Sequence, residues 1–195
     1  MGSFVRKFVF VVALGILAWI FVVPSCSTEF GCDAAGAVAH ADDGECPSGL
    51  EDAANDAEWA ADRIASLRAK KAKLTTGLFY DEDGAEHTHV SGYDENSDRA
   101  EEALDEAGVE FPPAGRHPAA AHVETKIAAG MRDNDITFGV VVINHPGGPC
   151  GADPATERRF SCGVVVPAIL PEGSTLAVWF PGAVESVKLR GHASG

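Results

Sequence analysis

The stretch HVETKIAAGMRDNDITFGVVVINHPGGPCG, residues 122–151, decides the fold. Apolar side chains recur four residues apart in its first part, at Val123, Ile127 and Met131. This spacing places them on one face of a helix, so we expect a helix from about residue 121 to residue 132. The run FGVVVIN, residues 138–144, is apolar without polar alternation, which predicts a strand buried on both faces. A helix followed by such a strand indicates an α/β domain.

The segments on either side continue the pattern of strands and helices. Upstream, TGLFY and EHTHV predict two strands joined by the turn DEDG. Ser97 can cap a following helix over residues 98–107, and Gly108 can end it. Downstream, the apolar run TLAVWF, residues 175–180, predicts another buried strand. This order predicts a sheet packed by helices.

Length, composition and charge limit the classes of function. The chain has 195 residues, 46% of them hydrophobic, which suits one compact domain and a leader. The net charge of −14 argues against phosphate binding by the whole surface. Residues 27–112 hold 6 basic and 22 acidic side chains, whereas residues 113–195 hold 7 of each. The C-terminal part can therefore approach nucleic acid more easily than the total charge suggests.

The N-terminus predicts targeting to a membrane. Arg6 and Lys7 precede 16 apolar residues, 8–23, a length between that of a signal-peptide core and that of a spanning helix. The positive-inside rule then places the bulk of the chain outside the membrane. VPSC, ending at Cys26, is similar to a weak lipobox. Either Cys26 is acylated after cleavage, or the segment stays as an uncleaved anchor.

Three segments follow from these patterns. Residues 1–26 form the signal or anchor segment. Residues 27–73 form an acidic linker that ends in a helix over residues 56–73. Residues 74–195 form the domain that carries the candidate site.

The five cysteines leave one pair of particular interest. If Cys26 is lipidated, Cys32 and Cys46 can pair in an oxidising compartment. Cys150 and Cys162 remain, with 11 residues between them. They can form a disulfide, or they can be thiolate ligands of a metal. A loop of this length does not forbid a shared site, because the entropic cost of closure grows only as the logarithm of loop length.

The order of four residues favours the metal site. His122 and Glu124 open the helix, a buried strand follows, and Pro149-Cys150 closes the loop after it. Cys162 can open another helix, although Pro167 would then fall past its first turn. This is the order of the zinc nucleotide deaminases, H-x-E…P-C…C. One imidazole and two thiolates hold Zn²⁺ and leave a fourth position for water, while a glutamate beside the metal moves protons.

The same residues carry a family resemblance. HVETKIAAGMRDNDITFGVVVINHPGGPCG, followed by SC and LPEGSTLAVWFP, resembles the DddA-like bacterial toxin deaminases, the SCP-type deaminase family, over about residues 74–190. The resemblance implies a cytidine-deaminase-like α/β/α sandwich with a mixed sheet, and conversion of cytosine to uracil in DNA. It also implies that His122, Cys150 and Cys162 bind zinc, that Glu124 is the proton shuttle, and that Asn144 lies at the pocket edge.

Further substrate contacts are expected around the cysteines. His145 stands where a second asparagine is expected in the family loop, which leaves open whether the substrate is duplex or single-stranded. The loop between the cysteines holds Arg158, Arg159 and Phe160. The two cations could contact the phosphate backbone of a nucleic acid strand, and the aromatic ring could stack on a base. The alternative is that this loop is only solvated.

Three functions stay open. The first is a zinc-dependent cytosine deaminase that acts on DNA as a bacterial toxin effector, with a cognate immunity protein covering its pocket. Such a toxin would be anchored or secreted through its N-terminal segment and would act in the cytoplasm of a target cell. The second is an exported, non-enzymatic lipoprotein with a Cys150–Cys162 disulfide. The third is a deaminase of free nucleosides or RNA.

Overall fold

The computed structural model describes residues 47–193 apart from residues 71, 114, 154, 156 and 157. The expected membrane segment and Cys26, Cys32 and Cys46 lie outside the described residues. Within the described ranges, no helix is both long and apolar enough to cross a membrane.

Five strands form one mixed sheet in the order β2-β1-β3-β4-β5. Their bounds are β1 Thr76–Tyr80, β2 Glu86–Val90, β3 Phe138–Ile143, β4 Thr175–Trp179 and β5 Val187–Arg190. Only β3 and β4 run parallel to each other, and the other neighbours are antiparallel. The expected hairpin is confirmed, since β1 pairs with β2 from Thr76↔Val90 to Tyr80↔Glu86.

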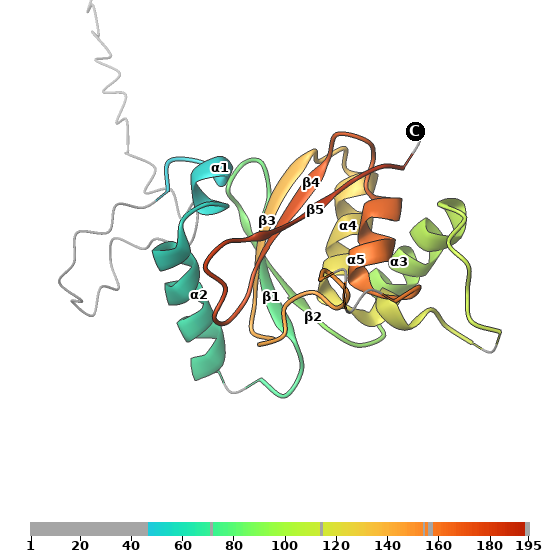
Figure 1. Cartoon of the computed structure of the whole chain (residues 1–195), viewed down its shortest axis with the longest axis horizontal. Coiled ribbons are helices and arrows are strands. Elements are labelled where there is room, and N and C mark those ends of the chain that lie inside the picture. The colour runs from blue at the N-terminus through green and yellow to red at the C-terminus, as the bar shows by residue number, and fades with distance from the viewer. Residues whose placement is uncertain (1–46, 71, 114, 154, 156–157, 194–195) are drawn as a thin grey trace, which may run out of the picture.

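Helices cover both faces of this sheet, as Figure 1 shows. One face carries α3, α4, α5 and a 3₁₀ turn, with bounds Glu95–Glu106, Val123–Asp133, Cys162–Ile169 and Pro118–Ala121 respectively. The other face carries the short α1, Leu50–Ala53, and α2, Ala57–Ala69. The fold is therefore an α/β fold of three layers with a mixed sheet.

Strand β3 is buried on both faces, as its uninterrupted apolar run predicts. Val141 and Ile143 belong to the core shared with α4 and α5. Val140 and Val142 belong to a second core shared with α1 and α2. The alternation of side chains along a strand separates the two sets.

The helix expected over residues 56–73, in the segment ahead of the domain, is α2, and it covers the second face of the sheet. Trp59, Ile64 and Leu67 of α2 are buried in the second core. The indole Nε1 of Trp179 on β4 donates to the carbonyl oxygen of Ala53 at 2.9 Å. The helix ends at Ala69, whereas the sequence predicted that it would continue to residue 73.

The start of α3 differs from the sequence expectation. Ser97 was expected as the cap, but the N-cap is Asp94, whose carboxylate accepts from the Ser97 amide at 3.0 Å. The Ser97 hydroxyl accepts in turn from the Asp94 amide at 2.8 Å, which completes a capping box. Both residues are good caps, and the reciprocal pair starts the helix three residues earlier than Ser97 alone would. Gly108, at φ +69°, follows the helix end as expected.

Helix α5 forms with Pro167 inside it. The proline lies only two residues before the end at Ile169, so its missing N–H removes one helical hydrogen bond. Its carbonyl accepts from the His192 amide at 3.0 Å, which ties α5 to the C-terminal segment. Burial of Val165, Val166 and Ile169 in the main core offsets the lost bond.

Candidate metal centre

Three potential metal ligands converge where two helices begin. His122 is the N-cap residue of α4, Cys162 is the first residue of α5, and Cys150 lies in the loop after β3. The His122 Nδ1 atom lies 3.1 Å from Cys162 Sγ and 3.5 Å from Cys150 Sγ. The two sulfur atoms are 3.4 Å apart. These three residues form one compact donor cluster.

The donor triangle suits zinc. Tetrahedral zinc with bonds of ~2.3 Å to sulfur and ~2.0 Å to nitrogen separates its donors by about 3.5–3.8 Å. The observed edges of 3.1–3.5 Å are slightly shorter, so a small outward movement accommodates the ion. Two thiolates and one imidazole are also a ligand set that zinc prefers. Three protein donors leave a fourth coordination position for water.

Cys150 also caps helix α5, which holds the two cysteines together. Its Sγ accepts from the Cys162 amide at 3.1 Å, and its carbonyl oxygen accepts from the Gly163 amide at 2.9 Å. These amides are among the donors that a helix N-terminus leaves without a helical partner. Gly151, at φ +70°, makes the turn that brings the loop back to the helix.

Gly163 fits so closely against this loop that no side chain is possible. A Cβ on Gly163 would lie 2.1 Å from the carbonyl oxygen of Gly151. The absence of a side chain therefore allows the close approach of the loop to α5. The 11 residues between the cysteines leave this junction intact.

Glu124 lies beside the donor cluster. His122 has an extended backbone, with φ −83° and ψ 147°, so its side chain and that of Glu124 can face the same point although they are two residues apart. Glu124 is 4% exposed, and its Oε2 lies 4.0 Å from Cys162 Sγ. The arrangement brings together the four residues expected from the sequence pattern.

The protonation states reflect these contacts. Hydrogen bonding from the Cys162 thiol and then from His122 lowers the pKa of Cys150 to about 4, although burial opposes this. The bond to Cys150 raises the pKa of His122. Burial raises the pKa of Glu124. Cys150 is therefore held as a thiolate, and Glu124 is suited to carry a proton.

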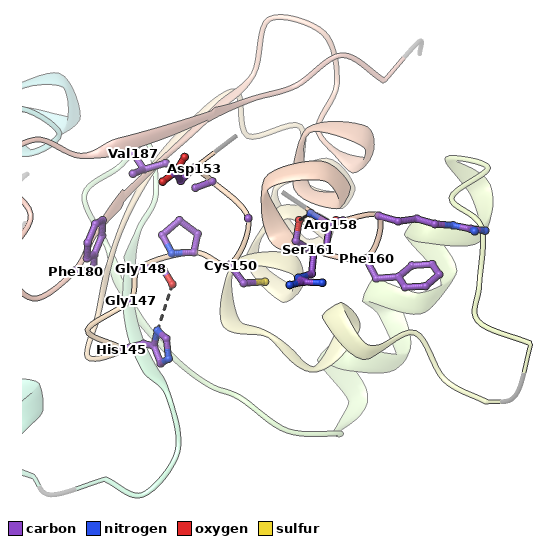
Figure 2. A pocket seen from close by; sticks show the side chains of 14 residues that line it. His145, Gly147, Gly148, Cys150, Asp153, Arg158, Phe160, Ser161, Phe180 and Val187 are labelled. Atoms are coloured by element: carbon purple, nitrogen blue, oxygen red, sulfur yellow. Dashed lines mark hydrogen bonds between the residues drawn. The ribbon is translucent and has the colours of Figure 1, made fainter. Parts of the chain in front are cut away.

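Two cavities meet at this cluster. A cavity of about 500 Å³ is lined by His122, Glu124 and Cys150 together with residues of the turns around Thr75 and Tyr93. A larger cavity of about 760 Å³ is lined mostly by residues 147–153 and 158–161 (Figure 2). His145, Gly148 and Cys150 line both. A ligand longer than a single nucleoside can therefore extend past the cluster.

Asn144 and His145 have different places in the structure. Asn144 Oδ1 accepts from the Thr76 amide at 2.9 Å, and this residue lines neither cavity. It joins the end of β3 to the start of β1. His145 is exposed and lines both cavities, and its Nδ1 lies 3.3 Å from the Gly148 carbonyl oxygen.

The three loop residues also differ from one another. All three line the larger cavity. Arg158 reaches toward Cys150 in Figure 2 and forms no ion pair with any described residue. Arg159 forms an ion pair with Glu110. Phe160 points away from Cys150 and its ring meets the His117 ring at 5.2 Å.

The cysteine pair is not a disulfide in this structure. Cys150 and Cys162 are free cysteines, and the 3.4 Å between their sulfur atoms exceeds the ~2.05 Å of a sulfur–sulfur bond.

The sequence patterns did not indicate two further groups near the site. Tyr93 lines the smaller cavity although 53% of it is exposed. Lys126 is 2% exposed, and its Nζ donates to Asp94 Oδ2 and to the Val90 carbonyl oxygen, both at 2.8 Å. Lys126 could have been noticed in the sequence, because it lies in the middle of an otherwise apolar helix face. A buried lysine needs a partner, so its position there indicates a polar contact.

A mixed sheet between helices, with a His-Cys-Cys cluster and a buried glutamate at two helix starts, defines a deaminase-type domain. The SCP1.201-like deaminase family matches residues 47–195, and the chain belongs to this family. The match takes in α1 and α2 as well as the sheet. No curated protein matches the chain.

Proposed function

We propose that the protein is a zinc-dependent deaminase that converts cytosine to uracil in DNA. The observation that carries this proposal is the convergence of His122, Cys150 and Cys162 beside the buried Glu124, at the meeting point of two cavities. Membership of the deaminase family supports the reaction type.

His122, Cys150 and Cys162 would hold the zinc ion. A bound zinc lowers the pKa of its water so that a nucleophile is present near neutral pH. Glu124 would take one proton from the attacking water and pass it to the base ring nitrogen. It would then take a second proton from the hydroxyl formed on the base carbon and pass it to the leaving ammonia. Water and cytosine are consumed, and uracil and ammonia are formed. Burial of Glu124 supports this role, because a raised pKa makes the carboxyl a better proton carrier.

The larger cavity supports a polynucleotide substrate. A free nucleoside needs only the smaller cavity, whereas neighbouring nucleotides need a continuing path. Arg158 lies along that path without an ion-pair partner among the described residues, so it can meet a phosphate. His145 stands where the two cavities join and can contact the target nucleotide.

A toxin role follows from the family resemblance. The N-terminal segment would bring the chain to the envelope, and the folded part would act in the cytoplasm of a target cell. A cognate immunity protein would block the two cavities in the producing cell. These expectations fail if the protein stays on the surface of the producing cell and never reaches another cell.

The test begins with the purified full chain, prepared without reductant. One zinc per chain and protected thiols are expected, followed by cytosine-to-uracil conversion on single- or double-stranded DNA. Conversion of RNA or free cytidine alone would replace DNA by the third candidate substrate. A chain with no zinc and no free thiols among Cys150 and Cys162 would support the non-enzymatic lipoprotein instead.

Glu124→Gln supplies the matched control. The substitution keeps the size of the side chain, so zinc content and the thermal midpoint should stay close to those of the unchanged protein. Loss of the proton carrier should lower kcat by about 10²–10⁴-fold. Normal turnover in this variant would remove Glu124 from the mechanism.

A further inference from the structure

We propose that Tyr93 is a stacking platform for the nucleobase next to the target cytosine, an inference that rests on the proposed function. Tyr93 lines the same cavity as His122 and Glu124. It is 53% exposed, whereas Phe160 and Phe180, which line the larger cavity, are both half-buried. An exposed ring that lines the cavity of His122 and Glu124 is placed where a bound ligand could contact it.

The turn that carries Tyr93 is held in place from both sides. The Gly92 amide donates to the Ala121 carbonyl oxygen at 2.8 Å, directly before His122. The Ser91 amide donates to the Thr75 carbonyl oxygen at 2.8 Å. Gly92 has φ +122°, a backbone conformation that residues other than glycine rarely adopt. The ring therefore has a defined position relative to the donor cluster.

Lys126 adds a connection between this turn and the catalytic helix. Its Nζ binds the Val90 carbonyl oxygen and Asp94 Oδ2, which flank the turn. Lys126 is on α4, two residues after Glu124. A buried cation with two partners fixes the distance between the turn and the helix more firmly than apolar packing alone.

Arg116 contacts the Tyr93 ring without burying the residue. The Arg116 guanidinium carbon lies 4.2 Å from the ring centroid and so covers one face. Glu101 and Asp98 both pair with this guanidinium, so its charge is already balanced. The residue nevertheless remains 53% exposed. An exposed ring beside a guanidinium whose charge is already balanced suits stacking of a base rather than phosphate binding.

Nucleobase stacking is the chemistry that this surface fits. Every base has a flat π-face, and aromatic side chains in single-strand sites use it without reading sequence. The target base itself must reach Glu124 inside the cavity, so a ring at the mouth meets the next base along the strand. A free nucleoside has no such base. The platform therefore predicts a polynucleotide substrate.

The direct test uses fluorescence. The Glu124→Gln chain is titrated with cytosine-containing oligonucleotides in which 2-aminopurine replaces the base on either side of the target. Stacking on Tyr93 should quench the probe at one of the two positions. The quenching should be lost in Glu124→Gln/Tyr93→Ala and kept in Glu124→Gln/Tyr93→Trp. Binding without quenching at either position would overturn the inference, whatever the activity of the protein.

Kinetics separate this inference from the proposed function. Tyr93→Ala should bind oligonucleotides about 10- to 100-fold more weakly and raise KM accordingly. Val184→Ala, an 85% exposed residue that lines neither cavity, is the matched control. Unchanged oligonucleotide turnover in Tyr93→Ala would refute the platform while leaving the deaminase intact. A wild-type chain without deaminase activity would refute the proposed function, and the fluorescence result would still decide the platform.

Discussion

Replacing Gly163 by alanine should move the loop that carries Cys150 away from Cys162 at the start of α5. The new Cβ would lie 2.1 Å from the Gly151 carbonyl oxygen and 2.5 Å from its carbon, and real contacts of this kind are not shorter than 3.0 Å. Both obstructing atoms belong to the backbone, so no side chain can turn away. The loop must therefore retreat from α5 by about 1 Å.

The retreat removes two contacts at the start of α5. These are the bond from the Gly163 amide to the Cys150 carbonyl oxygen and the bond from the Cys162 amide to Cys150 Sγ. Each is worth about 0.5–1.5 kcal/mol, and alanine in a helix returns about 0.5–1 kcal/mol. We expect a net loss of about 1–2 kcal/mol, which lowers the thermal midpoint by about 2–8 °C.

Gly163→Ala should change zinc affinity more than it changes the thermal midpoint. Ligand distances in a metal site are set within about 0.2 Å, so a shift of the Cys150 loop by several times that distance breaks the geometry. We expect zinc affinity to fall at least ~10–100-fold, measured by competition with a chelator.

Gly130→Ala is the control for this variant. Gly130 is also helical, in α4, and a Cβ there meets nothing within 4 Å. This variant should bind zinc normally and be more stable by about 0.5–1 kcal/mol. The reasoning is refuted if Gly163→Ala binds zinc as tightly as the unchanged chain and melts at the same temperature.

Two further predictions concern charge. Arg158→Gln should weaken oligonucleotide binding more at low salt than at high salt, whereas Arg159→Gln should change it less, because Arg159 is engaged by Glu110; equal, salt-independent effects would mean that the loop is only solvated. Partial burial alone would raise the pKa of Asp94, but hydrogen bonds from Lys126 and from the Ser97 amide bring it below its usual value. This contribution to stability is present above a pH of about 4 and is lost as the pH falls further. Thermal midpoints followed from pH 7 to pH 2 should therefore fall less steeply for Asp94→Asn, and identical slopes would contradict the assignment.

Sequence patterns were sufficient for strands β1 to β4 and for the main helix. The run FGVVVIN has no polar residue until Asn144, and its short length and its β-branched Val and Ile side chains favour a strand between two apolar layers. The repeat of Val123, Ile127 and Met131 predicted α4 to within two residues. The candidate ligands could be named because their order along the chain follows the chemistry of the site.

Local sequence patterns could not predict structure that depends on contacts between distant segments. Pro167 disfavours a helix locally, yet α5 forms because its neighbours are buried in the core. The four residues of β5 are too few and too mixed in character to predict, and their pairing with β4 decides their structure. The contact of Arg116 with Tyr93 joins segments on opposite sides of α3, so no spacing in the sequence marks it.

The two N-terminal helices limit where the chain can be cut. Ala53 and Ala54 accept hydrogen bonds from Trp179 and Ser186, and α2 covers Val140 and Val142. A polypeptide that starts at residue 74 would expose this apolar side of the sheet to water and tend to aggregate. A fragment that keeps both faces of the sheet covered must therefore begin before Leu50.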